Sequence, residues 1–209
     1  MEDLSEKAIK ANCPHCALAS QAYSYILEKT DNFYIICDAH PLVEGHILII
    51  PRQHISCVGA YPEILFKEFL KLNNKVSQFL MENYKSVSSF EHGIFGQTVF
   101  HSHIHYLPFN GKPTDIVPEN KISIIPNLSE LKNLLKKDGG YLFFSLEDNL
   151  ISVDVDITTP RFFRDRYARA LGKPERGNWK EMHGNQKLMK EAKTDNDNIQ
   201  VKWRSFFTQ

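Results

Sequence analysis

Three histidines alternate with other residues in the run FHSHIHYLP at residues 100–108. Successive side chains of a β-strand point to opposite faces, so a strand over this run would place His101, His103 and His105 on one face. Phe100 would then point into the core. Imidazole has a pKa near neutrality and serves as a nucleophile, a proton donor or a metal ligand. The run therefore predicts a strand that carries catalytic or metal-binding groups.

The segments around this run extend the pattern. Gly-Gln-Thr-Val at residues 96–99 leads into it, and an upstream loop over Asp38–His46 is followed by an apolar stretch and by His54. Together these segments resemble the histidine triad (HIT) family, whose motif is His-φ-His-φ-His-φ-φ with φ apolar. Ser102 departs from the apolar rule. The resemblance covers residues 10–110, about half of the chain.

The resemblance implies an enzyme that hydrolyses or transfers nucleotidyl groups. In similar proteins the middle histidine, here His103, attacks the α-phosphorus and forms a covalent nucleotidyl-histidine, and water then releases the nucleoside monophosphate. Neutral imidazole is a competent nucleophile at pH 7. His105 and His46 would contact the phosphate oxygens or the leaving group, as proton donors or electrostatic stabilisers. Dinucleoside polyphosphates, nucleotide sugars and phosphoramidates are the candidate substrates.

Three more positions are implied to bind the substrate. Asp38 matches an acidic residue that accepts hydrogen bonds from both ribose hydroxyls, although a loop aspartate that caps its own turn is the alternative. Gln97 and Thr98 match positions that touch phosphate oxygens, and a purely structural Gln97 is the alternative.

Two other activities stay open. One is a nucleotidyltransferase or phosphorylase, but transferases of this family tend to carry glutamine at the third triad position, where this chain has His105. The other is a nucleotide- or RNA-binding adaptor with little turnover.

The triplet Glu91-His92-Gly93 departs from the family pattern, which has Asn or Gln, a spacer and Gly at this place. A carboxylate there would repel phosphate unless it is turned away or protonated. The triplet resembles the HIT-like C-terminal region of splicing- and debranching-associated proteins, and residues 174–179 resemble the tail of the same proteins. The triplet therefore argues against ordinary dinucleoside polyphosphate specificity. His92 is either a further site residue or a loop histidine without a role.

Cys13-Pro14-His15-Cys16 is a C-x-x-C knuckle, which by itself is ambiguous between zinc, redox chemistry and no role. Bacterial HIT proteins and the related galactose-1-phosphate uridylyltransferases complete a zinc site with two histidines, whose places match His54 and His101. The resemblance therefore implies a structural Zn²⁺ with four protein ligands and no open position for water. These ligands are Cys13, Cys16, His54 and His101. His15 is expected to be a spacer.

The elements that would position these residues form a mixed pattern. Leu65, Phe69, Leu72, Val76 and Phe79 recur at steps of 4, 3, 4 and 3, which predicts a helix over residues 62–84 with one apolar face. Strands are predicted at residues 33–37 and 46–50 before this helix, and within 86–97 and at 98–107 after it. This order predicts an α+β sheet with one covering helix, and the resemblance implies the HIT fold, with an antiparallel sheet.

The pattern divides the chain into a HIT domain over residues 1–110 and a C-terminal α/β extension over residues 111–209. In the extension we predict a short element at 122–125, two short strands at 141–146 and 151–155, and helices at 129–136 and 159–171. Thr159 and Pro160 would be the N-cap and first residue of the last helix, and Gly172 would end it. A polar, loosely held tail would follow Lys173, apart from Trp179 and the patch at residues 203–207.

Composition excludes several classes of protein. Lys+Arg and Asp+Glu both number 25, so the net charge is zero and the whole surface does not attract nucleic acid or membranes. The longest apolar run, residues 47–51, is too short to span a bilayer, and the polar lead-in at residues 1–12 lacks a signal-peptide core. Four cysteines do not make a disulfide scaffold, so we expect the reducing cytoplasm, with Cys37 and Cys57 as packed thiols.

Basic residues concentrate between Arg161 and Lys190. Such a stretch could hold the phosphates of a nucleotide or an RNA, or it could be a solvated helix face. The expected partners are therefore a nucleotide substrate and, through this stretch, an RNA. A homodimer is a further expectation, because small HIT proteins commonly pair through the central helix and the sheet edge.

Overall fold

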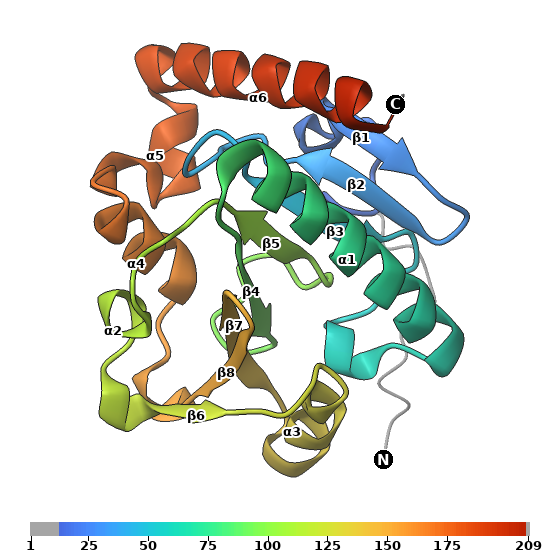
Figure 1. Cartoon of the computed structure of the whole chain (residues 1–209), viewed down its shortest axis with the longest axis vertical. Helices are drawn as coiled ribbons and strands as arrows, with labels where there is room; N and C mark the ends of the chain where they lie inside the picture. The colour runs from blue at the N-terminus through green and yellow to red at the C-terminus, as the bar shows by residue number, and fades with distance from the viewer. Residues whose placement is uncertain (1–12, 208–209) are drawn as a thin grey trace.

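The computed structural model describes residues 13–207, and the lead-in at residues 1–12 lies outside it. Within the described range, eight strands form one antiparallel sheet in the spatial order β1-β2-β3-β5-β4-β7-β8-β6 (Figure 1). The strands are β1 (Ile26–Lys29), β2 (Phe33–Cys37), β3 (Ile47–Pro51), β4 (Ser88–Gly93), β5 (Ile104–Leu107), β6 (Ile122–Ile124), β7 (Tyr141–Leu146) and β8 (Asn149–Val153). The sheet continues across residue 110, because β4 pairs with β7 along its whole length.

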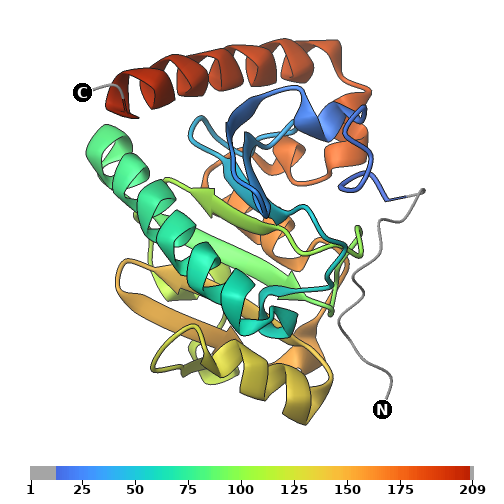
Figure 2. The same ribbon diagram turned by 90° about the vertical axis from the view of Figure 1, so that its right-hand side faces the viewer.

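Helices cover both faces of this sheet (Figure 2). On one face lie α1 (Glu63–Tyr84) and α3 (Glu130–Asp138), and on the other lie α2 (Pro113–Ile116) and α4 (Phe162–Ala170). α5 (Trp179–His183) follows α4 and leads into α6 (Gln186–Phe207), which runs across the β1–β2 end of the molecule. The predicted α+β architecture, an antiparallel sheet with a long covering helix, is confirmed.

The apolar pattern explains the two-sided core. All five residues that predicted α1 are buried, and α1 ends where Lys85 adopts a left-handed φ of 61°. β2 and β3 are buried along their whole length. Ile35 of β2 packs toward α1, whereas its neighbour Ile36 packs on the opposite face. Continuous apolar strands are expected where both faces of a sheet are covered.

The predicted strand over residues 98–107 is wrong in its first half, because β5 begins only at Ile104. β3 ends at Pro51, which has no N–H for a longer ladder. Upstream of β5 the backbone N–H of Ser102 instead donates to the carbonyl of Ile55 at 2.6 Å. Phe100 is consequently 62% exposed rather than in the core.

Two predictions for the extension are also wrong in part. α4 begins at Phe162, with Arg161 as its cap residue, so Thr159 and Pro160 precede the helix rather than start it. Its end near Gly172 is confirmed. The expected loose tail is largely the 22-residue helix α6. Trp203, in the patch expected to be held, packs against Phe79 of α1 at 4.9 Å between ring centroids.

Two smaller predictions concern the membrane and the thiols. No helix between residues 13 and 207 is both long enough and apolar enough to cross a membrane.

Cys37 and Cys57 are fully buried free thiols, as predicted. Burial raises the pKa of Cys57 to about 12, so this thiol is unreactive at neutral pH.

Candidate active site

A pocket of about 210 Å³ opens on the face of the sheet that carries α4. This volume is more than ten times the space that one water needs. Its walls follow the order of the strands: Ile36 and Asp38 come from the end of β2, Leu48 from β3, and His103 from the residues that enter β5. The pocket therefore places His103 between the β2 side and the β4 side.

His103 has one ring nitrogen fixed and the other free to react. Its Nδ1 lies 2.6 Å from the carbonyl oxygen of His101, and a carbonyl can only accept, so Nδ1 carries the proton. Nε2 therefore holds a lone pair. Burial, more than any other cause, lowers the pKa of His103 below its ordinary value. The ring is consequently a neutral imidazole at pH 7 with a nucleophilic Nε2.

His46 and His105 form a directed chain of hydrogen bonds. The backbone N–H of Leu42 donates to His46 Nδ1 at 3.0 Å, so the proton of His46 is on Nε2. That N–H donates to His105 Nδ1 at 2.9 Å, which leaves the proton of His105 on Nε2. The ring of His105 also stacks on Phe90, with centroids 4.3 Å apart. The chain therefore holds His105 as a hydrogen-bond donor beside His103.

Asp38 is buried beside these histidines and is paired with a residue of the extension. Its Oδ2 accepts a 2.7 Å bond from Arg164 of α4, and its Oδ1 accepts from the backbone N–H of His40 at 2.8 Å. Burial alone would raise the pKa of Asp38, but Arg164 and the nearby His46 lower it to about 2. Asp38 is thus a charged acceptor at neutral pH. The bond from His40 is the turn-capping contact that the alternative predicted, and Asp38 also lines the pocket.

Replacing Arg164 by methionine should destabilise the protein by about 3–5 kcal/mol at pH 7, because it leaves a buried carboxylate without its ion pair. Asp38 has a depressed pKa in the folded protein, so its stabilising contribution is present above about pH 4 and is lost as the pH falls toward 2. The difference between wild type and Arg164→Met should therefore shrink as the pH falls from 7 to 3. Urea unfolding at pH 7 and at pH 3 measures the difference in the free energy of unfolding between the two proteins. Equal stability at pH 7 would contradict the role of this pair.

Gln97 and Thr98 both line the pocket, as the sequence pattern predicts. The Nε2 of Gln97 donates to the carbonyl of Ser56 at 2.8 Å, so this side chain also has a structural role. Its buried Oε1 has no hydrogen-bond partner within residues 13–207. Thr98 is exposed at the rim. Gln97 is therefore fixed at the pocket wall by one end.

Glu91 lies on the opposite face of the sheet from the pocket. Its carboxylate accepts hydrogen bonds from the Ser102 hydroxyl at 2.9 Å, from the backbone N–H of Val58 at 3.0 Å and from the Tyr141 hydroxyl. The Ser102 hydroxyl also bonds the hydroxyl of Tyr61 at 2.8 Å. The two departures from the family pattern, Ser102 and Glu91, therefore satisfy each other. The predicted repulsion of phosphate by Glu91 does not arise.

The stability of the protein should depend on pH through Glu91. Burial raises the pKa of Glu91 to about 7, against the hydrogen bonds that lower it. A raised folded-state pKa means that its contribution is present below about pH 4.5 and is lost as the pH rises through 7. The difference in melting temperature, Glu91→Gln minus wild type, should therefore rise by about 3 °C per pH unit between pH 5 and 7. A constant difference across this range, measured by thermal unfolding, would exclude an ionising Glu91.

His92 and His15 also reach the pocket. His92 lies on β4 rather than in a loop, and its Nε2 accepts the backbone N–H of Phe163 at 3.2 Å, which caps α4. The ring of His15, expected to be a spacer rather than a metal ligand, packs edge-on against His103 with centroids 4.8 Å apart. Both rings line the pocket. The sequence of the knuckle contains no signal that predicts the contact between His15 and His103.

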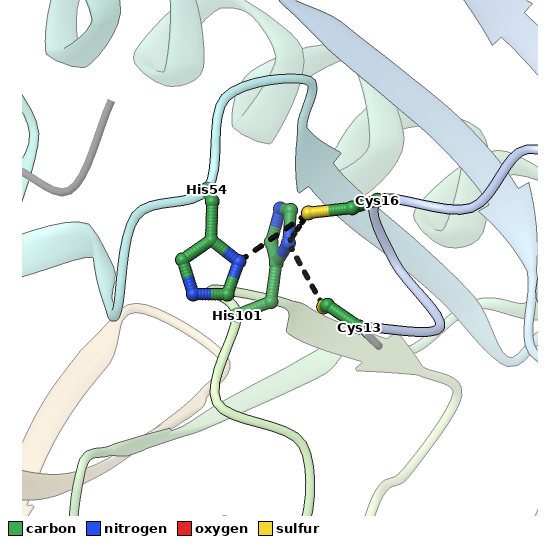
Figure 3. A group of neighbouring side chains, drawn as sticks. All are labelled: Cys13, Cys16, His54 and His101. Carbon is green, nitrogen blue, oxygen red and sulfur yellow. Dashed lines mark hydrogen bonds between the residues drawn. The ribbon is translucent and has the colours of Figure 1, made fainter. Parts of the chain in front are cut away.

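Cys13, Cys16, His54 and His101 converge at one point beside the pocket (Figure 3). Their potential ligand atoms all lie within 4.8 Å of one another. Cys16 Sγ is 3.3 Å from His54 Nδ1, and both sulfurs are 3.5 Å from His101 Nδ1. Tetrahedral zinc with thiolate and imidazole ligands requires S···N separations of about 3.6 Å. This group could hold a metal ion.

His101 is oriented for this group by its other nitrogen. Its Nε2 lies 2.8 Å from the carbonyl of Pro51, which can only accept, so the proton is on Nε2 and the lone pair of Nδ1 faces the two sulfurs. The prediction that His101 and His103 share one face is wrong, because the chain before Ile104 is not a strand. His101 turns to the cysteines and His103 lines the pocket.

The extension supplies residues that the sequence pattern did not assign. Arg161, Arg164 and Trp179 line the pocket beside the residues of the first half. Arg176 is also buried, and it pairs with Asp195 at 2.6 Å and Glu191 at 3.0 Å on α6. Part of the basic stretch is therefore used inside the protein. RNA contact through the remaining residues stays a prediction.

The sheet, its covering helix and the histidine pocket define an α+β domain of the histidine triad class. Residues 19–111 match the model of the HIT domain. An uncharacterized HIT-like protein of Chlamydia trachomatis is 34% identical over 86 residues, which cover 38% of this chain and 75% of that protein. The chain belongs to the HIT family.

Two further comparisons give more distant similarities. The adenosine 5′-monophosphoramidase of Saccharomyces cerevisiae is 24% identical over 110 residues, 52% of this chain and 70% of that protein. A HIT family hydrolase of Clostridium thermocellum has a solved structure with a TM-score of 0.42 and 25% identity, covering 50% of this chain and 98% of that one.

Proposed function

We propose that the protein is a nucleotide hydrolase that cleaves the bond between an α-phosphate and its leaving group through a covalent nucleotidyl-His103. The observation that carries this proposal is the state of His103, whose Nδ1–H is held by the carbonyl of His101 at 2.6 Å. That bond directs the Nε2 lone pair away from the backbone and stabilises the positive charge that the ring gains when Nε2 attacks. Relatives from two yeasts are named adenosine 5′-monophosphoramidases, which supports a nucleotide substrate.

The reaction has two steps. In the first, the lone pair of His103 Nε2 forms a bond to the α-phosphorus, and the bond from phosphorus to the leaving group breaks with its electron pair. The Nε2–H of the neutral His105, beside His103, is placed to donate a hydrogen bond to the charge that develops on the leaving group, and the leaving group takes its proton from water. In the second, water attacks the α-phosphorus and releases a proton to solvent, the P–N bond breaks, and the nucleoside monophosphate leaves with His103 restored.

Asp38 would bind the ribose in this scheme. Each of its oxygens already accepts one hydrogen bond, and a carboxylate oxygen has room for a second, so both ribose hydroxyls find an acceptor. Ile36 and Leu48 line the pocket on the same side and offer an apolar surface to the base. Gln97 and Thr98 would contact phosphate oxygens.

We further propose that the four-residue group of Cys13, Cys16, His54 and His101 binds a structural Zn²⁺. The donor set fits, because two thiolates and two imidazoles are the ligands that zinc prefers at tetrahedral separations. The ion would link the N-terminal knuckle to the backbone of His101, whose carbonyl orients His103. Four protein ligands leave no position for a water, so the role is structural. Free cysteines are consistent with a proposed cytoplasmic location.

Product analysis tests the proposed activity. The protein is incubated with adenosine and guanosine 5′-phosphoramidates, diadenosine triphosphate and a nucleotide sugar, and nucleoside monophosphates are separated and quantified. We expect monophosphate release from at least one substrate, and its loss in His103→Asn. Release that persists in His103→Asn would contradict the proposed nucleophile, and no release from any substrate would contradict hydrolysis.

A further inference from the structure

The charges around the pocket leave one cation for an anionic ligand. Asp38, Arg161 and Arg164 are the acidic and basic residues, histidines aside, among the described residues that line the pocket. Asp38 and Arg164 are an ion pair at 2.7 Å, and their charges cancel. Arg161 is the remaining charged residue among those within residues 13–207 that line the pocket.

Arg161 is only loosely held by its own ion pair. Its guanidinium lies 3.4 Å from Asp165, four residues further along the chain, and both side chains are about one third exposed. Exposed pairs at this spacing contribute little to stability. A phosphate in the pocket can therefore replace Asp165 as the partner at little cost. Phosphate, like a carboxylate, can accept two parallel hydrogen bonds from a guanidinium.

The position of Arg161 along the pocket indicates which part of the substrate it meets. Asp38 and the apolar residues lie at the β2–β3 side, and His103 lies in the middle, before β5. Arg161 lies at the β4 side, where its backbone N–H donates to the carbonyl of Gly96 at 3.4 Å. With the nucleoside at Asp38 and the α-phosphorus over His103, the leaving group extends toward Arg161.

The fold holds Arg161 at this place. Arg161 has a left-handed φ of 60°, which is uncommon for a residue with a β-carbon. A β-carbon on Gly96 would approach the carbonyl oxygen of Thr159 to 2.8 Å, so the two segments are in close contact. The N-terminus of α4 is further fixed by the hydrogen bond from Phe163 N–H to His92. The cation is thus presented from a rigid wall.

We propose that Arg161 selects substrates whose leaving group carries a phosphate next to the scissile bond. This inference rests on the proposed function and narrows its substrate class to nucleoside polyphosphates, dinucleoside polyphosphates and nucleotide sugars over phosphoramidates. The argument from Glu91 against such substrates does not hold, because Glu91 faces away from the pocket. The ammonia released from a phosphoramidate offers Arg161 no anion.

The test compares two substrates with the same nucleoside, diadenosine triphosphate and adenosine 5′-phosphoramidate. The quantity compared is kcat/KM for the triphosphate divided by kcat/KM for the phosphoramidate. In Arg161→Gln this ratio should fall about ten-fold or more. Arg161→Lys should retain most of the ratio. Arg169→Gln is the matched control, because it removes the same charge from an exposed position of α4 and should leave the ratio unchanged. An equal loss on both substrates would place Arg161 at the scissile phosphate and overturn the proposal.

A binding measurement separates this inference from the proposed hydrolysis. Dissociation constants of ADP and AMP are measured by calorimetry in His103→Ala, with and without Arg161→Gln. We expect ADP to bind about ten-fold tighter than AMP only when Arg161 is present. This result would support the role of Arg161 even if the wild type released no product. Equal binding of ADP and AMP in both variants would overturn the inference.

Discussion

Replacing His103 by asparagine is expected to lower kcat by about ten-thousand-fold or more while changing nucleotide affinity only a few-fold. The expected loss is large because His103 is the proposed nucleophile, and removing a nucleophile costs enzymes about this much. Binding should be retained because the proposed ribose contacts through Asp38 and the proposed apolar contacts through Ile36 and Leu48 do not involve His103. Asparagine keeps a donor that can reach the His101 carbonyl, which limits disturbance of the fold.

Single-turnover kinetics and calorimetric titration with nucleoside monophosphate measure the two effects separately. His183→Asn is a suitable control, because His183 is an exposed histidine at the end of α5. It should retain activity within about two-fold. A ten-fold or smaller loss in His103→Asn would exclude His103 as the nucleophile.

Replacing both knuckle cysteines, in Cys13→Ser with Cys16→Ser, is expected to remove bound zinc and to lower the melting temperature by about 10 °C or more. Loss of a structural metal removes its binding free energy from the folded state, and each kcal/mol is about 2–4 °C in a chain of this size. Activity should fall as well, because the carbonyl of His101 orients His103 and the ring of His15 packs against it.

Metal content by mass spectrometry and thermal unfolding measure the effect of the cysteine replacements. Cys37→Ala with Cys57→Ala is the matched control, since it removes two buried thiols that lie outside the four-residue group. This control should keep one zinc per chain. A double serine variant that is metal-free and as stable as wild type would contradict the structural zinc.

Local patterns explain why the first half of the fold could be predicted. The apolar spacing of α1 specifies one buried face, and the continuous apolar residues of β2 and β3 specify strands that are covered on both sides. The beginning of β5 could not be predicted in the same way. It depends on Pro51, which ends the neighbouring strand, and on the bond between Ser102 and Ile55. Alternation along the sequence does not contain this long-range contact.

The extension was harder to interpret for the same reason. α6 has a polar composition, and its stability comes from contacts such as Trp203 against Phe79, far apart in the chain. α4 starts at Phe162, and its first turn is held by His92, which accepts the backbone N–H of Phe163 from 71 residues earlier in the chain. A cap from a distant residue leaves no N-cap signal in the local sequence.

The candidate site likewise combines residues that local motifs predict with residues that only the folded chain brings together. His46, His103, His105 and Asp38 were predicted from local motifs and lie together. Arg164 reaches Asp38 from 126 residues away, and no local pattern distinguishes it from the other arginines of α4. Glu91 and Ser102 were individually puzzling as departures from the family pattern. Their shared hydrogen bond explains both.

The central claim is a covalent nucleotidyl-His103, and intact-protein mass spectrometry after rapid, acid-free quenching tests it most directly. The protein is mixed with diadenosine triphosphate or adenosine 5′-phosphoramidate for times from milliseconds to minutes. We predict a transient gain of one adenylyl group that maps to His103 and is absent in His103→Asn. Release of AMP without any such adduct, in wild type and at every time, would contradict the account.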